Sequence, residues 1–441
     1  MCRSDAGDRL AAGDPNRKGS PMSRPMRTDA EVSVIIPTYN RSAALRLTLE
    51  HLARQRLPVE RFEVIVTDDG STDDTRAVVD EAAGSLRIKY SYQPDEGFRA
   101  GAARNAGARL ATSPILAFLD TGTFVAPEYL ERLLAEYAGG ERLAVVGYAY
   151  GYDIDGEMPG LAEAMEGALP EDVVARFRDE PAFFDPRHRN FAAGDFDLGR
   201  LLAPWVLFWS LNCSVRAADF WRVGGFDEEF RRWGIEDLEL AYRLFKDGVN
   251  FRLTRSAWAV HAPQGRDRDA NMSDGKANIA HFIARHPEPP IEVIWKVMQR
   301  TEPLDLEDNY QFLLSWADKV STVDVADEVA RELPHLDAAG RTAVVGAGGR
   351  VPAGLSGAVL LDFDADLLAT ATADTSHLAY HAIGLRSPVA DDAVENVLLT
   401  SRLAGLWSRW GADFLAEAHR IGRSVRLTEE LAREVHALRR Y

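Results

Sequence analysis

The chain has 441 residues, 46% hydrophobic and 27% charged. This describes a globular protein, and the length predicts two domains. A formal net charge of −17 argues against a nucleic-acid-binding surface, which would need a basic stripe. Two cysteines, Cys2 and Cys213, exclude a disulfide framework and a cysteine zinc site. No run approaches the roughly 20 apolar residues of a membrane-spanning helix; the nearest, 201–215, contains Pro204 and Asn212.

The first 30 residues are polar, contain Pro, Gly, Asp and Arg, and lack the apolar segment of a secretory signal peptide. We expect residues 1–30 to form a disordered leader, part of which would lie upstream of the true start if that start is Met22 or Met26. With no apolar span in the sequence, the expected location is the cytoplasm.

From Glu31 onward, strand-like and helix-like segments alternate. The runs at 32–37, 62–71, 85–93 and 114–120 read as strands, and those at 42–55, 73–84 and 102–111 as helices. This order predicts a parallel, doubly wound α/β sheet, whose ligands bind beyond the carboxyl ends of the strands. Three of those ends are polar: Thr38-Tyr39-Asn40, Asp68-Asp69 and Asp120. Each could cap a helix or form a turn, but three at one edge predict a site.

The next segment is less regular. The runs at 144–154 and 209–216 are strand-like, 157–203 is acidic and loop-rich, and 249–267 reads as a strand followed by a loop. A helix is predicted to begin at Glu236-Asp237, with an apolar stripe at Leu238, Ala241, Tyr242 and Phe245. The two acids suit the positive end of a helix dipole, which by itself would explain them.

The prolines of "HPEPPIE" (286–292) predict a domain boundary. Residues 291–338 are expected to form a helical linker that packs back on the first domain. Residues 339–441 contain strand-like runs and helices of their own, so we expect a second, small α/β domain there.

Five motifs carry a family resemblance: "VSVIIPTYNR" (32–41), "VIVTDDGSTDDT" (64–75), "GFRAGAARNAGA" (97–108), "FLDTGTFVAPEYL" (118–130) and "GGFDEEFRRWGIEDLELAYRL" (224–244). In this order they resemble the family 2 glycosyltransferases of GT-A fold, and most closely their chondroitin-polymerase and galactosyltransferase branch. The resemblance implies a GT-A (nucleotide-diphospho-sugar transferase, Rossmann-like) domain at 31–290. It also implies inverting transfer of a hexose from a UDP- or GDP-sugar to an acceptor hydroxyl, of a soluble natural product or a glycan.

An inverting transfer needs a base for the acceptor hydroxyl and charge stabilisation for the departing diphosphate. The family's "WG-x-ED" motif places the base at Asp237, which leaves Glu236 to contact the acceptor or to brace its loop. By the same resemblance, Asp69 accepts from the nucleobase, with Asp68 or a purely turn-forming role as alternatives. Other expected nucleotide-sugar contacts are Pro37, Thr38, Tyr39, Asn40, Arg41, Arg99, Arg104, Asp120, Thr121 and Trp233. Arg104 suits a structural ion pair equally well.

The "LDTG" segment departs from the family's D-x-D pattern, in which two carboxylates help to hold a divalent metal. Asp120 matches the first, but Gly122 stands in place of the second. His261 falls where related enzymes have a metal-binding histidine, although a lone histidine is often structural. The implied Mn²⁺ or Mg²⁺ would therefore be held weakly by Asp120 and His261, with donor phosphates as further ligands. Residues 263–275 read as a lid over the donor.

The second domain resembles the late strands and helix of a class I methyltransferase, but "GAGG" (346–349) lacks the full glycine-rich turn. The run between its first two strands is also too short for a normal helix. We read this domain as a degenerate remnant used for packing, dimerisation or acceptor binding. For the protein as a whole, two alternatives to an active glycosyltransferase stay open. One is an inactive sugar-nucleotide-binding or scaffold protein, and the other is a bifunctional glycosyltransferase-methyltransferase. A homodimer stays open.

Overall fold

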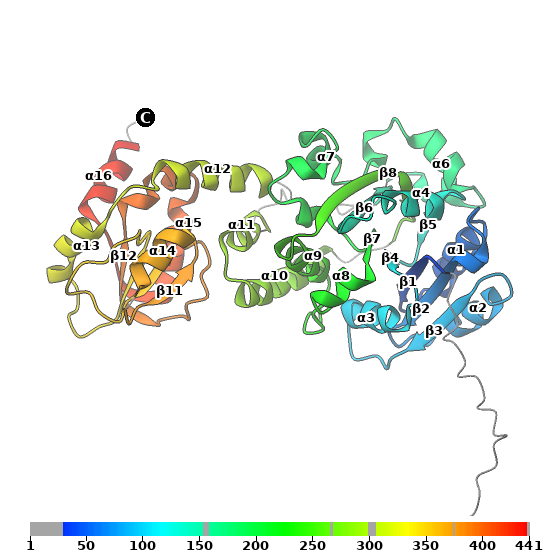
Figure 1. The fold of residues 1–441 in the computed structure, drawn as a ribbon, viewed down its shortest axis with the longest axis horizontal. Helices are drawn as coiled ribbons and strands as arrows, with labels where there is room; N and C mark the ends of the chain where they lie inside the picture. The colour runs from blue at the N-terminus through cyan, green and yellow to red at the C-terminus, as the bar shows by residue number, and fades with distance from the viewer. Residues whose placement is uncertain (1–29, 153–157, 265–267, 299–305, 374, 439–441) are drawn as a thin grey trace, which may run out of the picture.

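The computed structural model describes residues 30–152, 158–264, 268–298, 306–373 and 375–438. Of the expected leader, only Ala30 falls within these ranges. Two sheets lie at opposite ends of an elongated molecule, and helices in the green-to-yellow part of the chain join them (Figure 1). No helix among the described residues is long and apolar enough to cross a membrane.

Four strands of the first sheet are parallel, as predicted. They are β1 (Val32–Thr38), β2 (Phe62–Asp68), β3 (Ile88–Tyr92) and β4 (Ile115–Leu119), in the order β3-β2-β1-β4. Strands β1, β2 and β4 are buried along almost their whole length, which suits strands that helices cover on both faces, whereas β3 at the edge of the sheet is only partly buried. The crossovers contain α1 (Ser42–Ala53), α2 (Thr75–Ala82) and α3 (Ala100–Leu110).

Beyond β4 the sheet is mixed, which the prediction of a parallel sheet from residues 32–120 does not include. It continues with β7 (Asn212–Arg216), β6 (Leu143–Tyr150), β8 (Asn250–His261) and β5 (Thr123–Val125), and β7 runs antiparallel to both β4 and β6. No single crossover helix precedes β7. The chain instead passes through α5 (Leu161–Met165), α6 (Pro170–Phe177) and α7 (His188–Ala193), and it enters β7 from the opposite edge.

The predicted helix α9 (Glu236–Lys246) begins at its two acids, but its buried face differs from the expected stripe. Ala241 and Tyr242 are buried, together with Leu240 and Leu244, whereas Phe245 is 38% exposed. The helix packs against both the segment around Trp205 and the helix that carries Phe282, so its covered face is wide and displaced from Phe245. The remaining helices of this region are α4 (Tyr129–Glu136) and α8 (Ala217–Arg222).

Helix α10 (Arg268–Arg285) begins within the segment predicted as a lid: residues 268–275 form its first turns, and 265–267 lie outside the described residues, so the lid stays a prediction. The prolines 289 and 290 begin α11 (Pro289–Met298), a favoured position because a first-turn proline loses no helical hydrogen bond. Helix α12 (Leu306–Lys319) follows. Residues 291–338 are expected from the sequence to pack back on the first domain, but α13 (Ala326–Glu332) packs on the second sheet through Val329.

The second sheet is parallel throughout, in the order β11-β10-β9-β12-β13. Its strands are β9 (Thr342–Val345), β10 (Val359–Asp362), β11 (Leu378–His381), β12 (Val394–Leu399) and β13 (Gly422–Leu427). Its later helices are α14 (Ala365–Thr372), α15 (Trp407–Ile421) and α16 (Glu429–Leu438). As predicted, no helix separates β9 from β10. The sheet face that such a helix would cover is covered by α13, which precedes β9 in the chain.

Candidate active site

A cavity of about 740 Å³ opens beyond the carboxyl ends of the first sheet, where the sequence predicts a site. Residues from strand ends, loops and the starts of α9 and α10 line it. The predicted site residues among them are Pro37, Thr38, Tyr39, Arg41, Asp69, Arg104, Asp120, Thr121, Trp233, Glu236, Asp237 and His261. Asn40 and Arg99 lie beside the cavity and do not line it.

The two aspartates of "DDGS" have different surroundings. Asp68 is buried and accepts hydrogen bonds from the backbone N–H of Ser71 at 2.7 Å and the hydroxyl of Tyr90 at 2.7 Å. Asp69 lines the cavity, and its carboxylate accepts from Gln93 Nε2 at 2.5 Å and from the Arg99 backbone N–H at 2.9 Å. Burial raises the pKa of Asp69. Of the pair, Asp69 is therefore the one that a ligand can contact.

The loop after β1 is held by its own polar side chains. Asn40 has a left-handed backbone (φ 50°), and its Oδ1 accepts from the backbone N–H of Thr72 at 2.8 Å. Tyr39 is 47% exposed and donates from its hydroxyl to Asp95 Oδ2 at 2.8 Å. Asn40 thus braces the loop, while Tyr39 presents a large ring at the cavity wall.

Arg104 connects two carboxylates at the cavity wall. It is buried and donates from Nη2 to Asp120 Oδ1 at 2.8 Å and from Nη1 to Glu236 Oε1 at 3.0 Å. These contacts are those of a structural ion pair, which is one of the two roles predicted for Arg104. Arg99 is engaged separately, with Nη1 at 2.9 Å from Glu96 Oε2. The bond from Arg104 Nη1 holds Glu236 Oε1 in place, as a brace would require, while Glu236 also lines the cavity, so both predicted roles of Glu236 stay open.

Asp237 is held by the backbone of a neighbouring loop. Its Oδ2 accepts from the Ser210 backbone N–H at 3.1 Å, and its Oδ1 accepts from the Leu238 N–H at 2.9 Å. Burial raises the pKa of Asp237, although the Ser210 hydrogen bond and the Arg104 charge oppose the shift. Burial, with the Asp237 charge second, also raises the pKa of Glu236. Burial thus acts against the helix dipole, which favours the ionised form of acids in a first turn.

The place of the missing D-x-D carboxylate is filled. Gly122 has φ +90°, and a Cβ there would lie 2.7 Å from Gln264 Nε2. That amide nitrogen also lies 3.2 Å from the Thr121 carbonyl oxygen and 3.3 Å from His261 Nε2. Asp120 and His261 line the same cavity. Within the described ranges, no cluster of three or more His, Cys, Asp or Glu side chains is placed to hold a metal ion.

Sequence reasoning missed the far half of the cavity, which is mainly apolar. Its walls come from the 3-10 segment Pro204–Leu207, from Trp209, and from α11. The added lining residues are Leu201, Ala203, Val206, Leu207, Trp209, Met272, Ile294, Val297, Met298 and Leu306. The apolar run at 201–215 was visible in the sequence, but nothing there tells a cavity wall from a buried core.

Family models match two consecutive stretches of the chain. Residues 33–200 match "Glycosyl transferase family 2", and residues 202–262 match "N-terminal domain of galactosyltransferase". The chain is also 44% identical over 404 residues to "Validoxylamine A glucosyltransferase" of Streptomyces hygroscopicus subsp. jinggangensis, covering 89% of this chain and 96% of the relative. The chain belongs to glycosyl transferase family 2.

Two further matches of this glycosyltransferase are more distant. The chain is 31% identical over 253 residues to the chondroitin synthase of Escherichia coli, covering 56% of this chain and 37% of the relative. Among solved structures, Staphylococcus aureus TarS 1–349 in complex with UDP-GlcNAc matches at 18% identity with a TM-score of 0.43, covering 69% and 78% of the two chains. The enzyme is a hexosyltransferase of glycosyl transferase family 2, and its first domain has the α/β, GT-A architecture that the resemblance to this family implied.

The match to the Streptomyces relative extends over 404 residues, which is more than the number of residues that precede β9 in this chain. It therefore includes at least part of the second sheet. The relative thus shares at least part of the second domain as well as the first.

Proposed function

We propose that the enzyme transfers glucose, with inversion, from UDP- or GDP-glucose to a hydroxyl of a small natural product of the validoxylamine kind. The observation that carries the sugar and acceptor class is the 44% identity to a validoxylamine A glucosyltransferase along 96% of that relative. A second relative of the same name, from Streptomyces hygroscopicus subsp. limoneus, is 43% identical over 420 residues.

Asp237 is the proposed base. It takes the proton of the acceptor hydroxyl as that oxygen forms its bond to the anomeric carbon and the bond to the diphosphate breaks. Its position on the cavity wall and its raised pKa support this role, because a base works best when its pKa approaches the working pH. Arg104 and Glu236 are proposed to fix the start of α9 from below, so that Asp237 keeps its orientation.

The nucleotide is proposed to lie across the ends of β1 and β2. Pro37, Thr38, Tyr39 and Arg41 would border it, and Asp69 would accept a hydrogen bond from the nucleobase. Thr121 and Trp233 are proposed to contact the sugar-diphosphate part of the donor, since both line the same cavity. Asn40 and Arg99 would act through the loops that they brace.

A divalent cation fits the site only in part. Asp120 offers a carboxylate and His261 an imidazole, while Gly122 and Gln264 leave no second carboxylate. Oxygen donors suit Mn²⁺ and Mg²⁺, and Mg²⁺ commonly uses one or two protein carboxylates plus substrate phosphates. We propose that Asp120 and His261 hold such a cation weakly, and that it would supply positive charge to the departing diphosphate.

The second domain is proposed to have no methyltransferase activity. In a nucleotide-binding sheet the ligand meets the ends of the first strands. Here Asp362, at the end of β10, accepts from Arg402 Nε at 2.9 Å and Nη2 at 3.0 Å, and from the Gly348 backbone N–H at 2.8 Å. Both side chains of the ion pair are fully buried.

The test is a direct transfer assay. The full chain is incubated with validoxylamine A, Mn²⁺ and either UDP-glucose or GDP-glucose, and products are separated by mass spectrometry and their anomeric configuration read by NMR. A mono-glucosylated product of β configuration from an α-linked donor is expected. Turnover of neither donor, while another sugar nucleotide is consumed, would contradict the proposed sugar; a product of α configuration would contradict inversion.

A further inference from the structure

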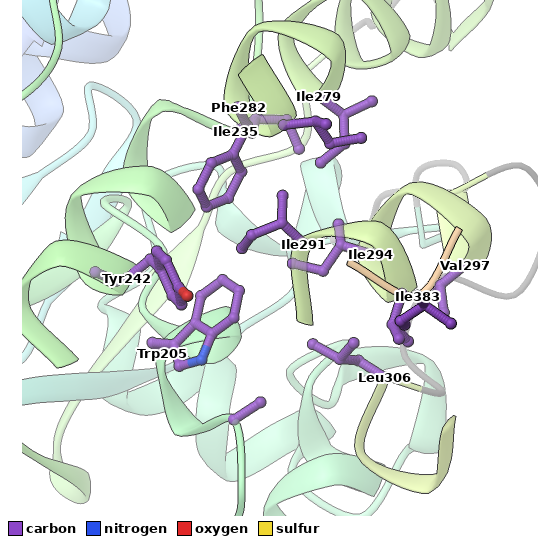
Figure 2. Packing of buried hydrophobic residues seen from close by; sticks show 14 of the residues in the cluster. Trp205, Ile235, Tyr242, Ile279, Phe282, Ile291, Ile294, Val297, Leu306 and Ile383 are labelled. Carbon is purple, nitrogen blue, oxygen red and sulfur yellow. The ribbon is translucent and has the colours of Figure 1, made fainter. Parts of the chain in front are cut away.

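Helix α11 belongs structurally to both domains. Figure 2 shows Ile291 and Ile294 among Trp205, Tyr242 and Phe282 of the first domain, with Val297 beside Ile383 of the second. These residues form one continuous apolar cluster that extends into both sheets. Any movement of α11 would therefore change the packing in both domains.

One carboxylate ties α11 to the second domain. Glu292 is 1% exposed, and it accepts hydrogen bonds from four successive backbone N–H groups after β11. Ile383 donates to Oε1 at 2.7 Å; Gly384, Leu385 and Arg386 donate to Oε2 at 2.9, 2.6 and 3.0 Å. Successive amides that converge in this way form an anion-binding concavity, and each charge-assisted bond is stronger than a neutral one.

Two side-chain contacts reinforce the same face of the helix. Lys296 pairs with Asp413 of α15, and the Arg386 guanidinium lies over the Trp295 ring at 5.5 Å from its centroid. The other face of α11 lines the cavity through Ile294, Val297 and Met298. The helix is thus a cavity wall whose back is fastened to the second domain.

We propose that the second domain positions the acceptor-side wall of the active site, and that Glu292, bound in the amide concavity of residues 383–386, is the positioning residue. This inference rests on the proposed function, because it places the acceptor in the apolar half of the cavity. The donor half is built by β1, β2 and the loops after them. The hydrogen bonds of Glu292 go to residues 383–386 and do not involve these elements.

The Glu292→Gln variant tests this. Gln replaces one carboxylate oxygen by an NH₂ group and removes the negative charge, so at least one of the four N–H donors loses its acceptor and the remaining bonds lose their charge assistance, which weakens the contact that holds α11 in place. We expect the acceptor KM to rise on the order of 10-fold or more, since misplacement of about 1 Å can cost 100-fold in rate. The donor Kd should stay within about twofold, and Glu292→Asp, which keeps the charge, should recover part of the acceptor affinity.

Glu417→Gln is the matched control. Glu417 is also a buried carboxylate, and it binds the next residue of the same loop, since its Oε1 accepts from the Ser387 N–H at 2.6 Å, but it lies on α15 and not on α11. Both variants should lower the melting temperature, whereas only Glu292→Gln should raise the acceptor KM. Equal rises in acceptor KM would overturn the proposal, because domain stability alone would then explain the effect.

Hydrogen exchange of α11 in the free protein separates this inference from the proposed function. Glu292→Gln should speed the exchange of α11 peptides, and Glu417→Gln should leave it unchanged, whatever the acceptor is. Faster α11 exchange without turnover of the proposed substrates would sink the function and keep the positioning role. Unchanged exchange with an unchanged acceptor KM would sink the positioning role itself.

Discussion

Both sheets place an aspartate at the end of a strand and an arginine against it, yet the first aspartate lines a cavity and the second is fully buried. Asp120 follows β4, contacts Arg104 through Oδ1, and keeps 32% of its side chain exposed. Asp362 ends β10, contacts Arg402 through both oxygens, and is fully buried. The same pair of residue types thus serves a candidate site in one domain and a sealed core in the other.

The difference lies in what surrounds the arginine. Arg104 donates its other hydrogen bond to Glu236 and not to a loop above Asp120, so Asp120 stays accessible from the cavity. Arg402 donates instead to the carbonyl oxygens of Val320 and Val323, so it draws the segment before α13 over the strand ends. A carboxylate at a strand end therefore predicts a ligand site only when the neighbouring loops leave it accessible.

The largest expected effect is at the open edge. Asp237→Asn should lower kcat by roughly 10²–10⁴-fold, the usual contribution of a general base, because an amide cannot take the acceptor proton. Donor binding, measured by calorimetry with UDP-glucose and GDP-glucose, should survive. The control is Asp227→Asn, which removes an aspartate of the same motif that pairs with His281 and Arg285 outside the cavity. A variant of Asp237 that retains more than a tenth of wild-type turnover would contradict the assignment.

At the closed edge the expected effect is on stability. Arg402→Met should cost about 3–5 kcal/mol of the unfolding free energy, since it leaves Asp362 buried without its charge partner. Chemical denaturation of the full chain measures this. The double variant Arg402→Met/Asp362→Leu should recover much of the loss, because it removes both charges together. A single variant as stable as the wild type would mean that the ion pair does not hold this edge closed.

The accessible Asp120 leads to the metal prediction. EDTA should lower transfer by about 10-fold or more, and Mn²⁺ or Mg²⁺ should restore it, because a cation on the diphosphate stabilises the charge that develops there. With two protein ligands at most among the predicted residues, binding should be detectable by calorimetry only when the donor is present. Tight binding to the nucleotide-free protein would contradict the weak site, and full activity in EDTA would contradict the need for a metal.

Most of the first domain followed from its sequence, because buried parallel strands and amphipathic helices have distinct periodicities. The positions of Asp69, Asp120, Asp237 and His261 at one cavity followed as well, from strand ends and motif order. The antiparallel β7 did not, since local patterning does not encode strand direction. Neither did α11 as a cavity wall, because its apolar face in the sequence is that of any buried helix, and Glu292 finds its partners some 90 residues later.

The smallest expected effect is the absence of a response at the second sheet. S-adenosylmethionine, titrated into the full chain, should give no heat and no thermal shift, because Asp362 and the Gly348 amide already satisfy each other and Arg402 fills the space beside them. The matched probe is UDP-glucose or GDP-glucose, one of which should shift the melting temperature of the same sample through the open edge. Micromolar binding of S-adenosylmethionine would show that the edge opens in solution, and the contrast between the two sheets would fail. If Arg402→Met binds it where the wild type does not, the arginine alone keeps the second edge closed.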